Sequence, residues 1–188
     1  MQFIDADDNG DEVVRSLIKD TKVLSVSDLV SDFNPSYLGD DAGQFDDNFE
    51  RAVSFADGIL ERMIAQARYE IATRELVAEI LAKNTDKRFA ILKRPISMKG
   101  LSSHFPDLLY IIFPEPINQH YFVYALRKRD EEFASRKPFP ESWAGLRSGE
   151  MARVSGVADA TFCHKMRFLV VAKSLDGAKQ LVYKALEN

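Results

Sequence analysis

The sequence holds few residues that could cross-link the chain or bind a soft metal. Its only cysteine is Cys163, so no disulfide can form within its 188 residues. The three histidines, His104, His120 and His164, are too scattered to suggest a metal cluster. No apolar run approaches the length of a membrane span. We therefore expect a cytoplasmic protein of a reducing compartment, with no membrane partner.

Positive charge is scarce near the start of the chain. Residues 1–50 hold 3 Lys and Arg against 13 Asp and Glu, whereas residues 51–188 hold 22 against 16. One interpretation is two differently solvated surfaces. The other is a cation-binding edge followed by an anion-binding surface. A hydrophobic content of 46% lets a chain of this length bury a core, so disorder is not expected.

Helical periodicity dominates the first half of the sequence. Two short amphipathic helices are predicted between Asp11 and Asp32, the second with Ser27 as its cap. The strongest signal runs from Asp47 to Lys83, where apolar residues recur near helical spacing. This region predicts one long helix, or two with a break, and we interpret it as a connector.

After residue 86 the period becomes that of strands. Five short runs rich in aromatic and β-branched residues are predicted as strands, at 89–92, 108–113, 121–126, 161–163 and 168–171. A terminal helix over 174–186 follows, with Ser174 as its cap. The expected fold class is α/β (α+β), with a helical N-terminal connector followed by a mixed five-stranded sheet that helices cover.

Three acids cluster near the start of the chain, at Asp5, Asp7 and Asp8. They follow an apolar pair, as carboxylates do at the end of a strand. Carboxylate oxygens are preferred ligands of Mg²⁺ and Mn²⁺, so one of these acids is a candidate metal ligand. A solvated turn before Asn9-Gly10 is the alternative interpretation.

Residues 136–147 read RKPFPESWAGLR and predict a rigid loop. Trp143 offers a large anchor, and Arg136 and Arg147 offer planar donors that suit phosphate or carboxylate. The alternative is structural: Trp143 fills the core, and the arginines cap carbonyls or pair with acids. We predict that Trp143 itself is buried and is not a base-stacking platform.

Residues 162–168 read FCHKMRF and predict a hairpin. Its tip would present His164, Lys165 and Arg167, which could hold a phosphate or take part in proton transfer. A histidine that only forms surface hydrogen bonds is the alternative. Cys163 has no partner base in the sequence, so we do not expect a thiol nucleophile.

Together these segments resemble the melanocyte-proliferating-gene (MYG) family of metal-dependent hydrolases, which belongs with the DHH phosphoesterases. The resemblance spans nearly the whole chain, and RKPFPESWAGLR is its most specific part. The other matching segments are DADDNG at 5–10, FNP at 33–35, Phe49 with Ala52, VSGV at 154–157, FCHKMRF at 162–168 and DGA at 176–178.

The resemblance implies a two-domain enzyme whose N-terminal domain binds divalent metals through motifs that include Asp-His-His. That triplet does not occur in this sequence, and only Asp5 and Asp8 match the family's last acidic motif. The implied organisation is the end of a catalytic DHH-like domain or linker at 1–40, a helical connector at 41–86 and a C-terminal substrate-binding α/β domain at 87–188.

The resemblance also implies an RNA exonuclease or phosphodiesterase that acts on short RNA or another phosphodiester. Arg136, Arg147, His164 and Arg167 would then hold substrate phosphates. Mn²⁺ or Mg²⁺ is expected only together with an N-terminal catalytic domain, supplied in cis or in trans, and a second copy of the chain is a further candidate partner. Some relatives carry Gly-Gly just after FCHKMRF, where this chain has larger residues, so backbone binding of phosphate is not expected there.

A second function stays open from the residues alone. The chain could be a stand-alone module that binds nucleic acid or protein without hydrolysis. The first interpretation requires metal ligands from outside this sequence, whereas the second does not.

Overall fold

The computed structural model describes residues 24–34, 44–129 and 133–188. The chain divides into two compact units, residues 1–67 and 68–188. Asp5 and Asp8, the predicted metal ligands, lie outside the described residues. None of the helices within those ranges is long and apolar enough to cross a membrane.

Helix α2 (Val26–Ser31) begins at a capping box. The hydroxyl of Ser25 accepts a hydrogen bond from the Asp28 backbone N–H, and the Asp28 carboxylate accepts one from the Ser25 backbone N–H. The prediction of Ser27 as the cap is wrong. A capping box needs an acid or amide three residues after the cap, and Asp28 meets that condition for Ser25 only.

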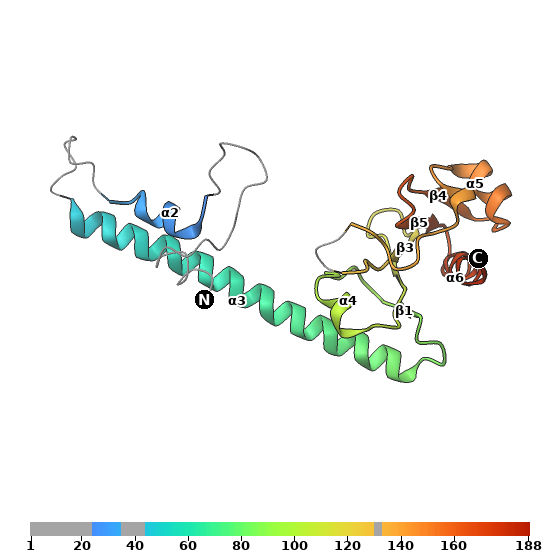
Figure 1. Ribbon diagram of the computed structural model, residues 1–188, viewed down its shortest axis with the longest axis horizontal. Helices are drawn as coiled ribbons and strands as arrows, with labels where there is room; N and C mark the ends of the chain where they lie inside the picture. Colours follow the sequence, from blue (N-terminus) through green and yellow to red (C-terminus); the bar gives the residue numbers. More distant parts are fainter. Residues whose placement is uncertain (1–23, 35–43, 130–132) are drawn as a thin grey trace. The chain divides into compact units, whose positions relative to one another are not determined.

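Helix α3 (Phe45–Lys83) is one continuous helix, which settles the choice between one helix and two (Figure 1). Gly58 lies in its interior without a break, although glycine costs about 1 kcal/mol relative to alanine at such a position. In the first unit, Phe55 of α3 packs 5.5 Å from the ring of Phe33, between ring centroids. In the second unit, Val77 and Leu81 of α3 are buried against the sheet.

The second unit is built on a five-stranded mixed sheet in the order β1-β2-β3-β5-β4. Its strands are β1 (Phe89–Ile91), β2 (Tyr110–Pro114), β3 (Tyr121–Ala125), β4 (Ala160–Cys163) and β5 (Leu169–Ala172). Only β1 and β2 pair in parallel, and the other neighbours are antiparallel. The mixed α/β fold with five strands is therefore confirmed.

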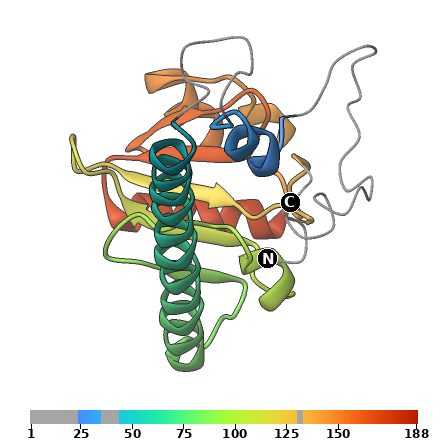
Figure 2. The same ribbon diagram turned by 90° about the vertical axis from the view of Figure 1, so that its left-hand side faces the viewer.

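Alternation along the strands gives the sheet two different faces. One face carries Tyr110, Ile112 and Val123, which pack against α6 (Leu175–Glu187). Helix α5 (Ser148–Ser155) and the short helix η1 (Glu141–Trp143) contribute to the same core. Figure 2 shows α6 lying along this side of the strands.

The start of α6 is fixed by a predicted cap and a close backbone approach. The Ser174 hydroxyl accepts a hydrogen bond from the Gly177 N–H at 3.0 Å, which confirms the cap, and donates one to the Asp159 carboxylate. A Cβ on Gly177 would collide with that carboxylate. Glycine in the DGA segment is therefore required for the helix to approach Asp159.

The opposite face is covered over β1 and β2 by the end of α3 and by α4 (Leu101–His104). Ile111 and Phe113 of β2 are buried there. Farther across, Phe122 and Tyr124 of β3 and Phe162 of β4 are only half-buried. The register places them on one face, because Phe122 pairs with Val171 and Val171 pairs with Phe162. We call this surface, which carries Phe122, Tyr124 and Phe162, the half-exposed face.

Candidate functional site

Three of the four predicted phosphate-binding residues gather around the β4–β5 hairpin. His164 and Arg167 lie in its turn, where the Arg167 N–H donates to the His164 carbonyl at 2.7 Å. Arg147 is the residue just before α5, and it contacts the hairpin through a β-bridge to Phe162. The hairpin itself is as the sequence predicted, since the polar residues separate two strand-like runs.

His164 is held by its own turn. Its Nδ1 accepts a hydrogen bond from the Met166 N–H at 3.1 Å, so the proton of the neutral ring is assigned to Nε2. The ring is half-buried and lies 4.3 Å from the Phe168 ring, between centroids. His164 can therefore present one N–H donor from a fixed orientation.

Arg147 is the most exposed of the arginines around this hairpin. Its guanidinium carbon lies 5.1 Å from the centre of the Phe162 ring, a cation–π contact that leaves the edge of the guanidinium able to donate. Arg167 is half-buried and adopts a positive φ of 58°. Its Nη1 approaches the Phe139 carbonyl at 3.4 Å, so part of its donor capacity is used within the fold.

Arg136 lies elsewhere and is engaged by the backbone. Its guanidinium donates to the carbonyls of residues 102, 105, 106 and 108. These contacts are the carbonyl caps of the structural interpretation. The structure thus brings together Arg147, His164 and Arg167 but not Arg136, and substrate binding by any of the four stays a prediction.

A row of aromatic rings crosses the half-exposed face and ends beside Arg147. Neighbouring centroids are 5.4, 6.2, 4.3 and 6.3 Å apart. The members of this ring row are, in spatial order, Phe113, Tyr124, Phe168, His164 and Phe162. They come from three separate segments, β2, β3 and the β4–β5 hairpin, that strand pairing brings together. Aromatic surfaces of this kind stack on flat ligands such as bases.

Sequence reasoning missed Tyr124 and Phe168 as site candidates. The available signal was the alternation in β3, which places Phe122 and Tyr124 on one face, and the two phenylalanines that flank the HKM turn. In the sequence, Tyr124 and Phe168 have the pattern of ordinary strand residues. Their proximity depends on the pairing of β3 with β5, which the sequence does not reveal.

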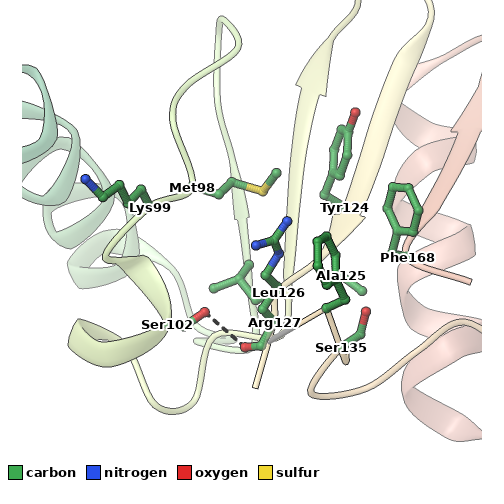
Figure 3. A pocket seen from close by; sticks show the side chains of 10 residues that line it. Met98, Lys99, Ser102, Tyr124, Ala125, Leu126, Arg127, Ser135 and Phe168 are labelled. Carbon is green, nitrogen blue, oxygen red and sulfur yellow. Dashed lines mark hydrogen bonds between the residues drawn. The ribbon is translucent and has the colours of Figure 1, made fainter. Parts of the chain in front are cut away.

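A cavity of about 680 Å³ lies at the C-terminal end of β3, next to the ring row. We call it the β3-end cavity. Its walls include Met98, Lys99, Tyr124, Arg127, Phe133 and Phe168. Figure 3 shows Met98 and Lys99 on one side and Tyr124 and Phe168 on the other, with the Arg127 guanidinium between them. The Ser102 hydroxyl donates to the Arg127 carbonyl at 3.0 Å and ties α4 to this edge.

Two residues of the predicted motifs are structural. Trp143 is 3% exposed and stacks on Phe139 at 6.2 Å between centroids, so the buried position predicted for it is confirmed. Cys163 is buried, and that burial raises the pKa of its thiol to about 11. A thiol held protonated in this way is a poor nucleophile.

Metal-binding side chains are not clustered within the described residues. Within residues 24–34, 44–129 and 133–188, no three His, Cys, Asp or Glu side chains are grouped as a metal ion needs. The described residues therefore do not fit Mn²⁺ or Mg²⁺, and the prediction for Asp5 and Asp8 falls outside them.

Comparison with known proteins gives consistent matches. The MYG1 protein of Chlamydia muridarum is 28% identical over 170 residues, which cover 87% of this chain and 56% of that protein. A MYG1 protein of Caenorhabditis elegans is 26% identical over 205 residues, covering 100% of this chain and 59% of that protein. The MYG1 exonuclease of Homo sapiens is 23% identical over 200 residues, covering 99% and 53%.

The chain spans little more than half the length of these curated relatives. No solved structure matches it significantly. The family model MYG1_exonuc, described as an uncharacterised protein family (UPF0160), matches residues 1–186. Since that match covers nearly the whole sequence, the chain belongs to the MYG1_exonuc family (UPF0160).

Proposed function

We propose that this chain is the substrate-binding, C-terminal part of a metal-dependent phosphoesterase that degrades short RNA. A nuclease-like function is suggested by the family and by the name exonuclease that the human relative carries. The assignment to DHH phosphoesterases and the C-terminal position within a longer enzyme belong to the proposal. The relatives are longer than the part that the chain covers, which is compatible with a position inside a longer enzyme.

The observation that carries the proposal is that Arg147, His164 and Arg167 all lie at the β4–β5 hairpin, two in its turn and one bridged to Phe162. An exposed guanidinium and a fixed imidazole N–H are suited to phosphate oxygens, and Arg supplies a planar fork that Lys lacks. In this proposal Arg147 and His164 contact phosphates directly. Arg167 shapes the turn as well, because its donors are shared with the Phe139 carbonyl.

Arg136 has a different proposed role. Its guanidinium fixes the backbone between Ser102 and Leu108, which borders the β3-end cavity. We therefore place Arg136 as a residue that positions the site rather than one that touches phosphate.

The described residues supply binding and orientation, and hydrolysis is assigned to groups outside them. Asp5 and Asp8 are the proposed contribution of this chain to a Mn²⁺ or Mg²⁺ site. One or two carboxylates cannot complete the ligand set of a catalytic divalent cation, so the isolated chain should have negligible phosphodiesterase activity.

The test is a titration of short single-stranded RNA with the chain at two salt concentrations. Binding should weaken as salt rises, with a log–log slope of about −0.7 for each phosphate neutralised. Arg147→Ala should weaken all RNA sequences alike, since phosphate contacts carry no base information. Arg153→Ala is the matched control, because Arg153 is also exposed but lies in the last turn of α5.

Three outcomes would contradict the proposal. Salt-insensitive binding, or none at millimolar RNA, would remove the phosphate-binding role from the hairpin. Robust Mn²⁺-dependent turnover abolished by Asp8→Ala would show that the chain holds a complete catalytic site. A full-length relative could also bind RNA but fail to hydrolyse phosphodiesters. That result would favour the second function, a module that binds without hydrolysis.

A further inference from the structure

We propose that the β3-end cavity receives an unpaired nucleobase of a single-stranded nucleic acid. The base would stack on Tyr124 and Phe168, while Arg127 and Lys99 attract the flanking phosphates. The choice of ligand class rests on the proposed function, but the side chains involved are different from Arg147, His164 and Arg167. The volume of about 680 Å³ lies within the range of about 300–1,000 Å³ that is usual for small-molecule sites.

The first support is the geometry of the two half-buried rings. Tyr124 and Phe168 lie 6.2 Å apart between ring centroids with an interplanar angle of 28°, and both line the cavity, where they make up its aromatic wall. Figure 3 shows both side chains on the same side of the cavity. Every base has a flat π-face, so such a wall binds bases without regard to sequence.

The second support is Phe133, an exposed ring among the residues that line the cavity. Its side chain is 89% exposed although it borders the cavity. The guanidinium carbon of Arg127 lies 5.0 Å from the centre of its ring, which holds the ring beside the cavity mouth. If a base were stacked on the Tyr124–Phe168 wall, Phe133 could pack against the outer side of that base and so bury apolar surface.

The third support is charge. Lys99 and the consecutive cations Arg127, Lys128 and Arg129 are all exposed around the end of β3. Lys99 is 71% exposed even though its Nζ lies 3.2 Å from the Glu70 carboxylate. Residues 130–132 are acidic and lie outside the described ranges, so the salt dependence of binding measures the net attraction.

Together these features favour a nucleic acid over an apolar peptide. A peptide anchor would gain from the apolar walls but not from the surrounding cations. A base paired in a duplex could not stack on the wall, because both of its faces are already covered. The ligand chemistry common to RNA and DNA is an unpaired base linked to phosphates, and the 2′-hydroxyl separates the two sources.

The first experiment compares three labelled oligonucleotides of about eight nucleotides, a length within the usual range of single-strand sites. They are oligo-uridylate, oligo-thymidylate and an abasic oligomer with the same phosphates. The intact oligomers should bind about tenfold more tightly than the abasic one, because one stacked base contributes that much. Equal affinity for all three would overturn the proposal, and so would no binding at millimolar concentration.

The second experiment changes the ring at an exposed position, so that folding is preserved. Phe133→Leu keeps apolar bulk and removes the π-face, whereas Phe133→Tyr keeps both. Leucine should weaken binding of oligo-uridylate several-fold and leave binding of the abasic oligomer unchanged, and tyrosine should restore affinity. Ile117→Ala, at an 85% exposed apolar residue in the β2–β3 turn, is the control and should have no effect.

The third experiment locates the base. An oligonucleotide with a photoreactive halogenated uracil should cross-link to Tyr124, Phe168 or Phe133. Cross-links only to Tyr183, a 47% exposed ring on α6, would overturn the proposal. If Arg147→Ala weakens binding but Phe133→Leu does not, the stacking inference fails and the proposed function stands. The reverse result would refute the hairpin and retain the cavity.

Discussion

The guanidinium carbon of Arg147 lies 5.1 Å from the centre of the Phe162 ring, and the same two residues form a β-bridge. The backbone bridge fixes where the arginine leaves the chain, and the ring supports its charged end. Because the arginine side chain is already held in place, binding a phosphate costs it less conformational entropy.

This relationship predicts different effects for two substitutions. Arg147→Lys retains the charge but loses the planar fork, so it should weaken RNA binding less than Arg147→Ala. Arg147→Ala should lower the free energy of unfolding by about 0.5–1 kcal/mol, the usual value of an exposed cation–π contact, and Arg147→Lys should lower it less, because an ammonium can retain part of that contact. Fluorescence titration and urea unfolding measure the two effects. Equal affinity for wild type and Arg147→Ala would contradict the prediction.

Arg136 should matter for stability and not for phosphate binding. Arg136→Ala leaves several carbonyls between residues 102 and 108 without a donor, and we expect a loss of about 3 kcal/mol. Arg136→Lys should recover only part of this loss, because an ammonium cannot span the same carbonyls. Chemical denaturation gives the stability. An unchanged unfolding midpoint together with lost RNA affinity would assign Arg136 to the substrate instead.

Trp143 should report on the core that it fills. Trp143→Ala should cost about 3–5 kcal/mol, because a buried ring that stacks on Phe139 is replaced by a void. Trp143→Phe keeps an aromatic ring and should cost clearly less. Thermal unfolding followed by circular dichroism compares the three proteins. A stable Trp143→Ala protein that no longer binds RNA would reverse the structural assignment.

The buried hydroxyl of Tyr110 has no hydrogen-bond partner among the described residues. The Tyr110 ring stacks on Phe139 at 5.1 Å between centroids, a contact that phenylalanine would retain. Tyr110→Phe should therefore raise the free energy of unfolding by about 1 kcal/mol, since it removes an unpaired buried donor. Equilibrium urea unfolding measures this change. A lower free energy of unfolding for Tyr110→Phe would contradict the prediction and show that the hydroxyl has a partner.

The Cys163 thiol should react slowly in the folded protein, and its burial should make the protein less stable as pH rises above about 8.5. Burial raises the pKa of its thiol to about 11, above the value in the unfolded chain. Its contribution is therefore fully present below the unfolded pKa of about 8.5 and is lost as pH rises toward the folded pKa. Between these values the slope should approach about −1.4 kcal/mol per pH unit for one proton.

Urea unfolding at several pH values between 8 and 10 checks this slope, and Cys163→Ala should flatten it. Native protein should also react slowly with iodoacetamide at pH 8 and rapidly in guanidinium chloride. Rapid alkylation of the folded protein would contradict the burial.

Much of the fold follows from local pattern. The apolar spacing between residues 47 and 83 predicted α3, and alternation predicted the five strands to within about two residues, which is the usual uncertainty of element ends. Caps were harder. Ser174 was identified correctly, but Ser27 was chosen where Ser25 caps, because the choice depends on the acid at Asp28.

The sequence by itself determined the family motifs, the helical and strand periods, the hairpin at 162–168 and the burial of Trp143. All of these depend on residues close together along the chain. Only the tertiary structure decided which cations share a surface. Arg136 faces carbonyls about thirty residues away and Arg147 faces Phe162. Likewise, Tyr124 meets Phe168 because β3 pairs with β5. Such contacts follow from strand order and register, which no local pattern specifies.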